Sequence, residues 1–152
     1  MPQSLAQILV HVVFSTKNRA PVIGAEMRPR LHAYLSTVAR NMGCECYRAG
    51  GVADHVHLAI GLSRTVTIAG VVEEVKTSSS KWLKTQAQTP SLAEFEWQRG
   101  YGAFSVGWSG RELLCRYIDA QEAHHRERTF QDEYRAMLRK YEVPFDERYV
   151  WD

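Results

Sequence analysis

The segment from Ile8 to Thr16, near the start of the chain, places the strongest constraint on the fold. It reads ILVHVVFST and is rich in β-branched and apolar side chains. Such a run predicts a strand that is buried on both faces. It is far too short to cross a membrane, which needs ~20 apolar residues. His11 lies in the middle of this strand, where a histidine is more often satisfied within the core than used as a metal ligand.

The next elements continue a split β-α-β pattern. Apolar residues at helical spacing predict a helix over Ala25–Met42, with Gly43 as its cap. Two short strands are expected at Cys44–Ala49 and His55–Leu62, close enough in sequence to form a hairpin. A second helix is expected from Thr67 to Lys84, and the later part of that helix is polar and basic.

The last third of the chain begins with the aromatic-rich run Phe95–Val106, which predicts a strand pair with a tight turn or bulge. Ser109 is a suitable N-cap for a helix over Arg111–Arg126, and a final helix is expected at Thr129–Tyr141. The order of elements predicts an α+β fold: a ferredoxin-like or RRM-like antiparallel sheet with helices on one face, plus C-terminal helices. We expect a single domain over residues 1–152, because no linker or internal repeat divides the chain.

Composition restricts the function only weakly. Hydrophobic residues make up 45% and charged residues 24% of the chain, as in ordinary globular proteins. The net charge of +2 suits a nucleic-acid partner but equally suits an ordinary enzyme. Three cysteines at irregular spacing match neither a zinc ribbon nor a disulfide framework. With no signal peptide or membrane span in the sequence, we expect a cytoplasmic protein without a membrane partner.

The segment Asp54-His55-Val56-His57-Leu58 is the strongest chemical signal. On a strand, side chains two positions apart share a face, so His55 and His57 would converge while Val56 faces the core. Two such imidazoles form half of a metal site. Two ordinary histidines on a half-exposed strand are an equal alternative. Asp54 could orient a ligand imidazole or serve the turn before the strand.

A second signal is Tyr117-Ile118-Asp119-Ala120-Gln121. Residues four apart share a helix face, so Tyr117 and Gln121 would project together. A tyrosine hydroxyl is a weak nucleophile that a nearby cation improves, and an amide oxygen could complete a metal's ligands. Taken alone, the segment would be a core tyrosine and a surface glutamine. His125, four residues after Gln121, is expected at a solvated helix end, with a supporting role near the metal as the alternative.

Together these segments resemble the small single-tyrosine transposases of the His-hydrophobic-His endonuclease superfamily. These enzymes mobilise bacterial insertion sequences of the 200/605 type and include the REP-associated tyrosine transposases. The resemblance runs nearly end to end. It covers HVVFSTKNR from His11 to Arg19, DHVHL from Asp54 to Leu58, WQRGYGAFSV from Trp97 to Val106, YIDAQ from Tyr117 to Gln121, His124-His125, and ERYVW from Glu147 to Trp151.

The resemblance implies a function and a set of site residues. His55, His57 and Gln121 would hold Mg²⁺ or Mn²⁺, and Tyr117 would attack single-stranded DNA at a hairpin-flanked end. The reaction would leave a 5′-phosphotyrosine and a free 3′-OH, which can later rejoin strands without ATP. The resemblance also implies a homodimer, in which the tyrosine helix of one subunit can complete the metal site of the other.

Contacts with DNA are expected mainly from the basic helix and from scattered cations, because amines and hydroxyls suit phosphate oxygens. A plain solvated face has about equal weight. The expected residues are Lys17, Arg19, Lys76, Ser79, Lys81 and Arg99. Two other functions stay open: a domesticated relative that binds hairpin or repeat DNA without transposition, and an unrelated metal-dependent hydrolase built around His55 and His57.

Overall fold

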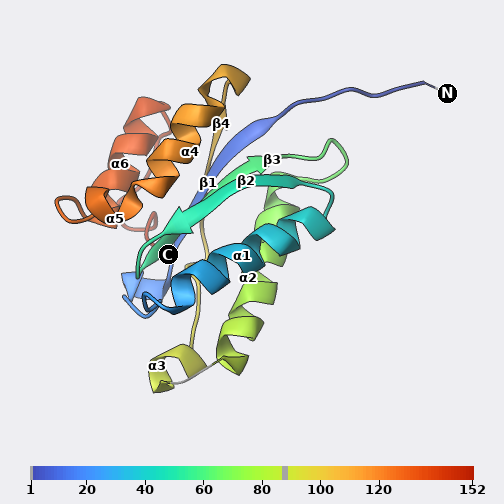
Figure 1. The fold of residues 1–152 in the computed structure, drawn as a ribbon. Helices are drawn as coiled ribbons and strands as arrows, with labels where there is room; N and C mark the ends of the chain where they lie inside the picture. Colours follow the sequence, from blue (N-terminus) through green and yellow to red (C-terminus); the bar gives the residue numbers. More distant parts are fainter. Residues whose placement is uncertain (1, 87–88) are drawn as a thin grey trace.

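An antiparallel sheet of four strands organises the chain (Figure 1). The structure is a computed structural model that describes residues 2–86 and 89–152. The strand order is β2-β3-β1-β4, as in the ferredoxin-like arrangement predicted from the sequence. The strands are β1 (Leu9–Ser15), β2 (Glu45–Gly51), β3 (His55–Gly61) and β4 (Gly102–Val106).

Helices cover both faces of this sheet (Figure 1). The long helices α1 (Met27–Asn41) and α2 (Ile68–Thr85) pack on one face. The other face carries α4 (Arg111–Asp119), α5 (Gln121–His124) and α6 (Phe130–Lys140). The short helix α3 (Pro90–Ala93) follows α2. In the part of the chain that the structure describes, no helix is both long and apolar enough to span a membrane.

Strand β1 lies at the centre of the sheet, between β3 and β4. All seven of its residues are buried, which confirms the prediction of a strand buried on both faces. Val12 and Phe14 face the core under α1 and α2, whereas Leu9 and Val13 face the helices of the C-terminal part. The sheet therefore separates two apolar cores, and β3 runs beside β1 through the middle of both.

Three sequence predictions for the last third of the chain were wrong in detail. Of the segment Phe95–Val106, only the last five residues form a strand, and Trp97 makes a single bridge with Thr16. The ammonium of Lys76 binds the carbonyl oxygens of residues 98, 99 and 100 at 2.8, 3.2 and 2.6 Å. In this segment Lys76, rather than a neighbouring strand, is therefore the partner of these carbonyls.

The helix expected at Arg111–Arg126 is interrupted. Ala120 has φ −90° and ψ 10°, which separates α4 from α5. Ser109 is not the N-cap either, because residues 108–110 form a 3-10 turn and the position before α4 is Gly110, with no side-chain cap. Tyr117 therefore lies in the last turn of α4, and Gln121 begins α5.

A glycine in β2 lets α4 approach the sheet closely. A Cβ atom added at Gly50 would lie 2.6 Å from Cγ2 and 3.0 Å from the backbone oxygen of Ile118. Ile118 is buried beside Ala59 and Leu114 in the core below α4. Because Ile118 follows Tyr117 directly, this contact fixes how near the tyrosine comes to β3.

We expect Gly50→Ala to destabilise the protein by about 1–3 kcal/mol, because overpacking forces a backbone shift at Ile118. Gly107→Ala is the matched control, since its nearest new contact would be Ser109 Oγ at 4.0 Å and its φ of −62° suits alanine. Urea unfolding followed by circular dichroism measures both variants. Equal stability of the two variants would contradict the close packing of α4 on β2.

Candidate active site

Strand β3 presents His55 and His57 to the face covered by α4, α5 and α6. Both side chains have no exposed surface, and their ring centroids lie 5.1 Å apart. Val56, between them, packs in the opposite core with α1 and α2. The two histidines thus converge on one face of the strand, in the arrangement expected from their spacing.

Each histidine is oriented by a partner on its Nδ1 atom. The Nδ1 of His55 lies 2.6 Å from Oδ1 of Asp54, and the Nδ1 of His57 lies 2.8 Å from Nε2 of His11. His11 is itself buried in β1, as the sequence suggested for a core histidine. These contacts leave the Nε2 atoms of both His55 and His57 directed toward the C-terminal helices. Such partners fix the orientation of ligand imidazoles.

Helices α4 and α5 bring Tyr117 and Gln121 to the same place. Gln121 is buried, and its Oε1 accepts a hydrogen bond from Nε2 of His55 at 3.0 Å. The Tyr117 ring centroid lies 5.6 Å from that of His57. One chain therefore places its tyrosine beside its own histidines, and this geometry does not require the tyrosine helix of a second subunit.

Two further residues, Glu133 and His125, complete the cluster. Glu133 lies in the first turn of α6 and has only 2% of its surface exposed. Its Oε1 lies 3.0 Å from Nε2 of His57 and 3.1 Å from Nε2 of His125. Its Oε2 accepts hydrogen bonds from the Tyr117 hydroxyl and from Nε2 of Gln121. The expectation of a solvated His125 was therefore wrong.

Glu133 was missed in the sequence, although a signal existed. It lies three residues after Phe130 and four before Met137, within the buried face of α6. A carboxylate on an apolar helix stripe is rarely buried without a partner. The spacing of Glu133 from Phe130 and Met137 places it on the apolar face of α6 but does not identify the histidines opposite that face.

The cluster shifts the proton affinities of its members. Burial alone would lower the pKa of His55, but hydrogen bonds and charges from Asp54 and Glu133 raise it to about 9. Burial lowers the pKa of His57, so that ring is neutral at pH 7. Burial would raise the pKa of Glu133, but hydrogen bonds from the surrounding histidines hold it well below its usual range. Burial and the Glu133 carboxylate raise the pKa of Tyr117 above its ordinary range.

These side chains fit a divalent metal ion. Ligand atoms of His55, His57, His125 and Glu133 all lie within 4.8 Å of one another. Gln121 adds an amide oxygen on the same side. A donor set of imidazole nitrogen with carboxylate and amide oxygen suits Mn²⁺ and other first-row ions, whereas Mg²⁺ prefers oxygen alone.

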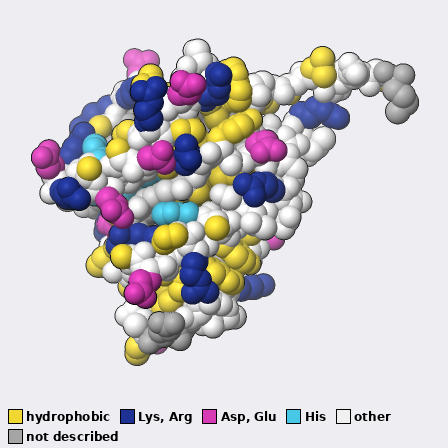
Figure 2. All heavy atoms as spheres, viewed as in Figure 1, with side chains coloured by type: hydrophobic (Ala, Val, Ile, Leu, Met, Phe, Trp, Pro, Cys, Tyr) yellow, Lys and Arg dark blue, Asp and Glu magenta, His cyan; other side chains and the backbone are white. Residues whose placement is uncertain are grey.

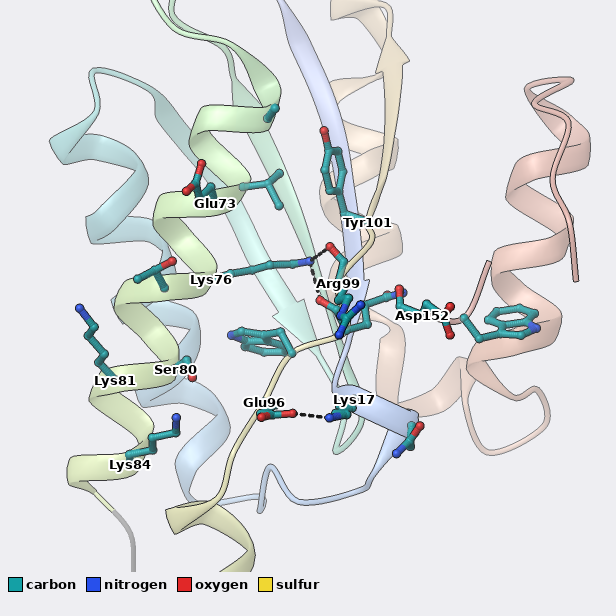
Figure 3. A pocket seen from close by; sticks show the side chains of 17 residues that line it. Lys17, Glu73, Lys76, Ser80, Lys81, Lys84, Glu96, Arg99, Tyr101 and Asp152 are labelled. Carbon is teal, nitrogen blue, oxygen red and sulfur yellow. Dashed lines mark hydrogen bonds and ion pairs between the residues drawn. The ribbon is translucent and has the colours of Figure 1, made fainter. Parts of the chain in front are cut away.

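Four of the six residues expected to contact DNA lie apart from this cluster, along a groove beside α2. A groove of about 930 Å³ runs between α2 and residues 96–101 (Figure 3). Of the expected residues, it is lined by Lys17, Lys76, Lys81 and Arg99, and Lys84 joins them. In Figure 3, Lys81 and Lys84 project from α2 on one side of this groove. The face of the molecule drawn in Figure 2 instead mixes basic and acidic side chains and forms no single basic patch.

Two of the expected DNA contacts do not line the groove. Ser79 is fully buried; its hydroxyl donates to the backbone oxygen of Val75 and accepts from the indole N–H of Trp97 at 2.9 Å. A DNA contact by Ser79 is therefore wrong. Arg19 lies over the Trp151 ring at 5.7 Å.

Comparisons with known proteins agree with this fold. No curated protein matches the chain. A crystal structure of a candidate transposase from Deinococcus radiodurans R1 has a TM-score of 0.63 and 22% identity over 80% of this chain and 95% of that one. A REP-associated tyrosine transposase, solved bound to a REP hairpin, has a TM-score of 0.59 and 12% identity over 82% of this chain and 73% of that one.

Both solved structures share the fold. The sequence itself matches the family model for IS200-like transposases over residues 4–121, from before β1 to Gln121. This match covers β1 to β4 and α4, and includes His55, His57 and Tyr117. The chain therefore belongs to the family of IS200-like transposases.

Proposed function

We propose that this transposase is a metal-dependent endonuclease and strand-transferase for single-stranded DNA, with Tyr117 as its nucleophile. One observation carries the proposal. The single buried carboxylate of Glu133 is surrounded by Tyr117, His55, His57 and Gln121, although these four positions span more than sixty residues of the sequence.

In this reaction the Tyr117 oxygen bonds to the phosphorus of a DNA phosphodiester, and the bond from phosphorus to the 3′ oxygen breaks. The Tyr117 hydroxyl gives up its proton and the departing 3′ oxygen takes one up, so the products are a 5′-phosphotyrosine and a DNA 3′-OH. A divalent metal at this site, Mg²⁺ or Mn²⁺, would polarise the phosphate oxygens and stabilise the charge that develops on them. His55, His57 and Gln121 would hold it, while Asp54 and His11 orient the two imidazoles.

The DNA partner in this proposal is a hairpin with a single-stranded flank. The solved REP-associated transposase was bound to a hairpin, and the lysine-lined groove here offers ammonium groups and aromatic side chains together. Such groups suit DNA phosphates and unpaired bases. A homodimer, as the family resemblance implies, remains a prediction that sedimentation velocity can test.

We expect wild-type protein with Mn²⁺ and hairpin-flanked single-stranded oligonucleotides to form a covalent adduct, seen on a denaturing gel. Tyr117→Phe should abolish the adduct, because it removes the only attacking oxygen. Tyr149→Phe is the matched control, since Tyr149 is 64% exposed, and it should react as wild type does.

Other outcomes would favour the competing functions. Tight hairpin binding by the wild-type protein with no adduct on any end-derived substrate would favour a domesticated binding protein. Metal-dependent turnover of small phosphoesters that survives Tyr117→Phe would favour an unrelated hydrolase.

The groove generates a second prediction. Lys81→Gln with Lys84→Gln should weaken hairpin binding and reduce the slope of log affinity against log salt concentration by about 2, because each lysine neutralises one phosphate. The control, Arg40→Gln with Arg64→Gln, makes the same change in net charge at exposed positions outside the groove. Fluorescence anisotropy at several salt concentrations measures both. Equal slopes for the two double variants would place the DNA elsewhere.

The raised pKa of His55 generates a third prediction. Below about pH 9, His55 in the metal-free protein carries a second ring proton and a positive charge. A histidine that binds a metal must lose that proton. Binding of Mn²⁺ at pH 7 should therefore release about one proton, while release should vanish above about pH 10 and affinity should rise between pH 7 and 9. Calorimetry in buffers of different ionisation enthalpy counts the protons.

Asp54→Asn provides the control for this prediction. It removes a carboxylate that raises the pKa of His55, so the variant should release fewer protons at pH 7. If the wild-type protein releases no proton when it binds Mn²⁺ at pH 7, His55 is not a charged imidazole whose proton the metal displaces.

A further inference from the structure

We propose that Glu133 is an additional protein ligand of the metal, through Oε1, so that a carboxylate from α6 closes the site made by the histidines. This inference rests on the proposed function, since it assumes that His55 and His57 hold a metal. Glu133 lies beyond the part of the chain that matches the family model, which ends at Gln121.

The first support is the burial of this carboxylate without a permanent cation. Glu133 is 2% exposed, and its ion-pair partners within the described residues are four histidines: His55, His57, His124 and His125. No lysine or arginine pairs with it in that part of the chain. A buried charge is costly unless it is paired. A divalent cation bound by the same imidazoles would pair with this carboxylate directly.

The second support is the direction of the nitrogen atoms around Oε1. The Nε2 atoms of His57, His125 and His55 lie 3.0, 3.1 and 3.4 Å from this one oxygen. The Nδ1 atoms of His55 and His57 are already used by Asp54 and His11. The remaining nitrogens of β3 are therefore the metal-binding atoms, and Oε1 is the oxygen that they share.

The third support is that hydrogen bonds to Oε2, the other oxygen of Glu133, hold the carboxylate in one position. Oε2 accepts from the Tyr117 hydroxyl, and it accepts from Nε2 of Gln121 at 3.1 Å. Thr129 caps the start of α6 by accepting from the N–H of Asp132 at 3.1 Å, one residue before Glu133. The carboxylate is thus held from both sides, with Oε1 directed at the imidazoles.

Mn²⁺ binding to the full-length protein tests this proposal. Loss of the free-ion electron paramagnetic resonance signal measures affinity directly, without DNA or turnover. We expect Glu133→Gln to weaken Mn²⁺ binding by at least about tenfold, the lower end of the loss seen even when residues that only support ligands are changed. Glu127→Gln removes the same charge from an exposed position in the turn between α5 and α6 and should bind as wild type does.

His57→Ala separates failure of this inference from failure of the proposed function. If His57→Ala loses Mn²⁺ and folded Glu133→Gln binds it as wild type does, the metal site stands and Glu133 is a structural ion-pair partner only, which overturns the inference. If none of the variants changes binding, the metal site itself is wrong.

Circular dichroism and urea unfolding establish that each variant is folded. Glu133→Asp serves if Glu133→Gln fails to fold, because it keeps the charge and withdraws the carboxylate by one methylene. We expect it to bind Mn²⁺ more weakly than wild type. Wild-type affinity in Glu133→Asp would overturn the inference.

Discussion

The buried contact between the Glu133 carboxylate and the imidazoles of β3 ties the C-terminal helices to the sheet. Apolar packing of Phe130 and Tyr134 brings α6 to this face, but apolar contacts do not select one orientation. A buried carboxylate does, because removing one partner from such a pair costs about 3–5 kcal/mol. The same contact reaches Tyr117 and Gln121, so the docking of α6 and the arrangement of the candidate active site are one structural problem.

The two halves of the site differ in how firmly the backbone holds them. His55 and His57 lie on a strand paired on both sides, to β1 and to β2, and their backbone cannot move without breaking the sheet. Tyr117 and Gln121 come from two short helices that are separated at Ala120. Their position depends on packing instead, above all on the close contact between α4 and β2. The half of the candidate site that contains His55 and His57 is therefore fixed by hydrogen bonds of the sheet. The half that contains Tyr117 and Gln121 is fixed by side-chain packing.

The periodic spacing of residues along the sequence predicted most of the fold and part of the candidate site. Alternation on β3 and the four-residue spacing of Tyr117 and Gln121 each report which side chains share a face, and the structure brings those faces together. Spacing does not report what lies opposite a helix. Glu133 therefore resembled any helix glutamate, and Ser79 resembled a surface hydroxyl until Trp97 was found to donate to it. The prediction of a strand pair at Phe95–Val106 was wrong for the same reason. Lys76, which lies on another element, binds backbone carbonyls of this segment.

The lysine-lined groove and the candidate active site lie on opposite sides of one sheet, yet a short hydrogen-bonded path joins them. Lys76 binds the carbonyl of Gln98 at 2.8 Å, and Oε1 of Gln98 accepts from the N–H of Ser15 at 2.7 Å. Ser15 is the residue of β1 that pairs with His55. If the groove holds the hairpin, the distance from the recognised duplex to the reacting phosphate is then set by the sheet rather than by a flexible linker. The position of cleavage relative to the hairpin would follow from that fixed distance.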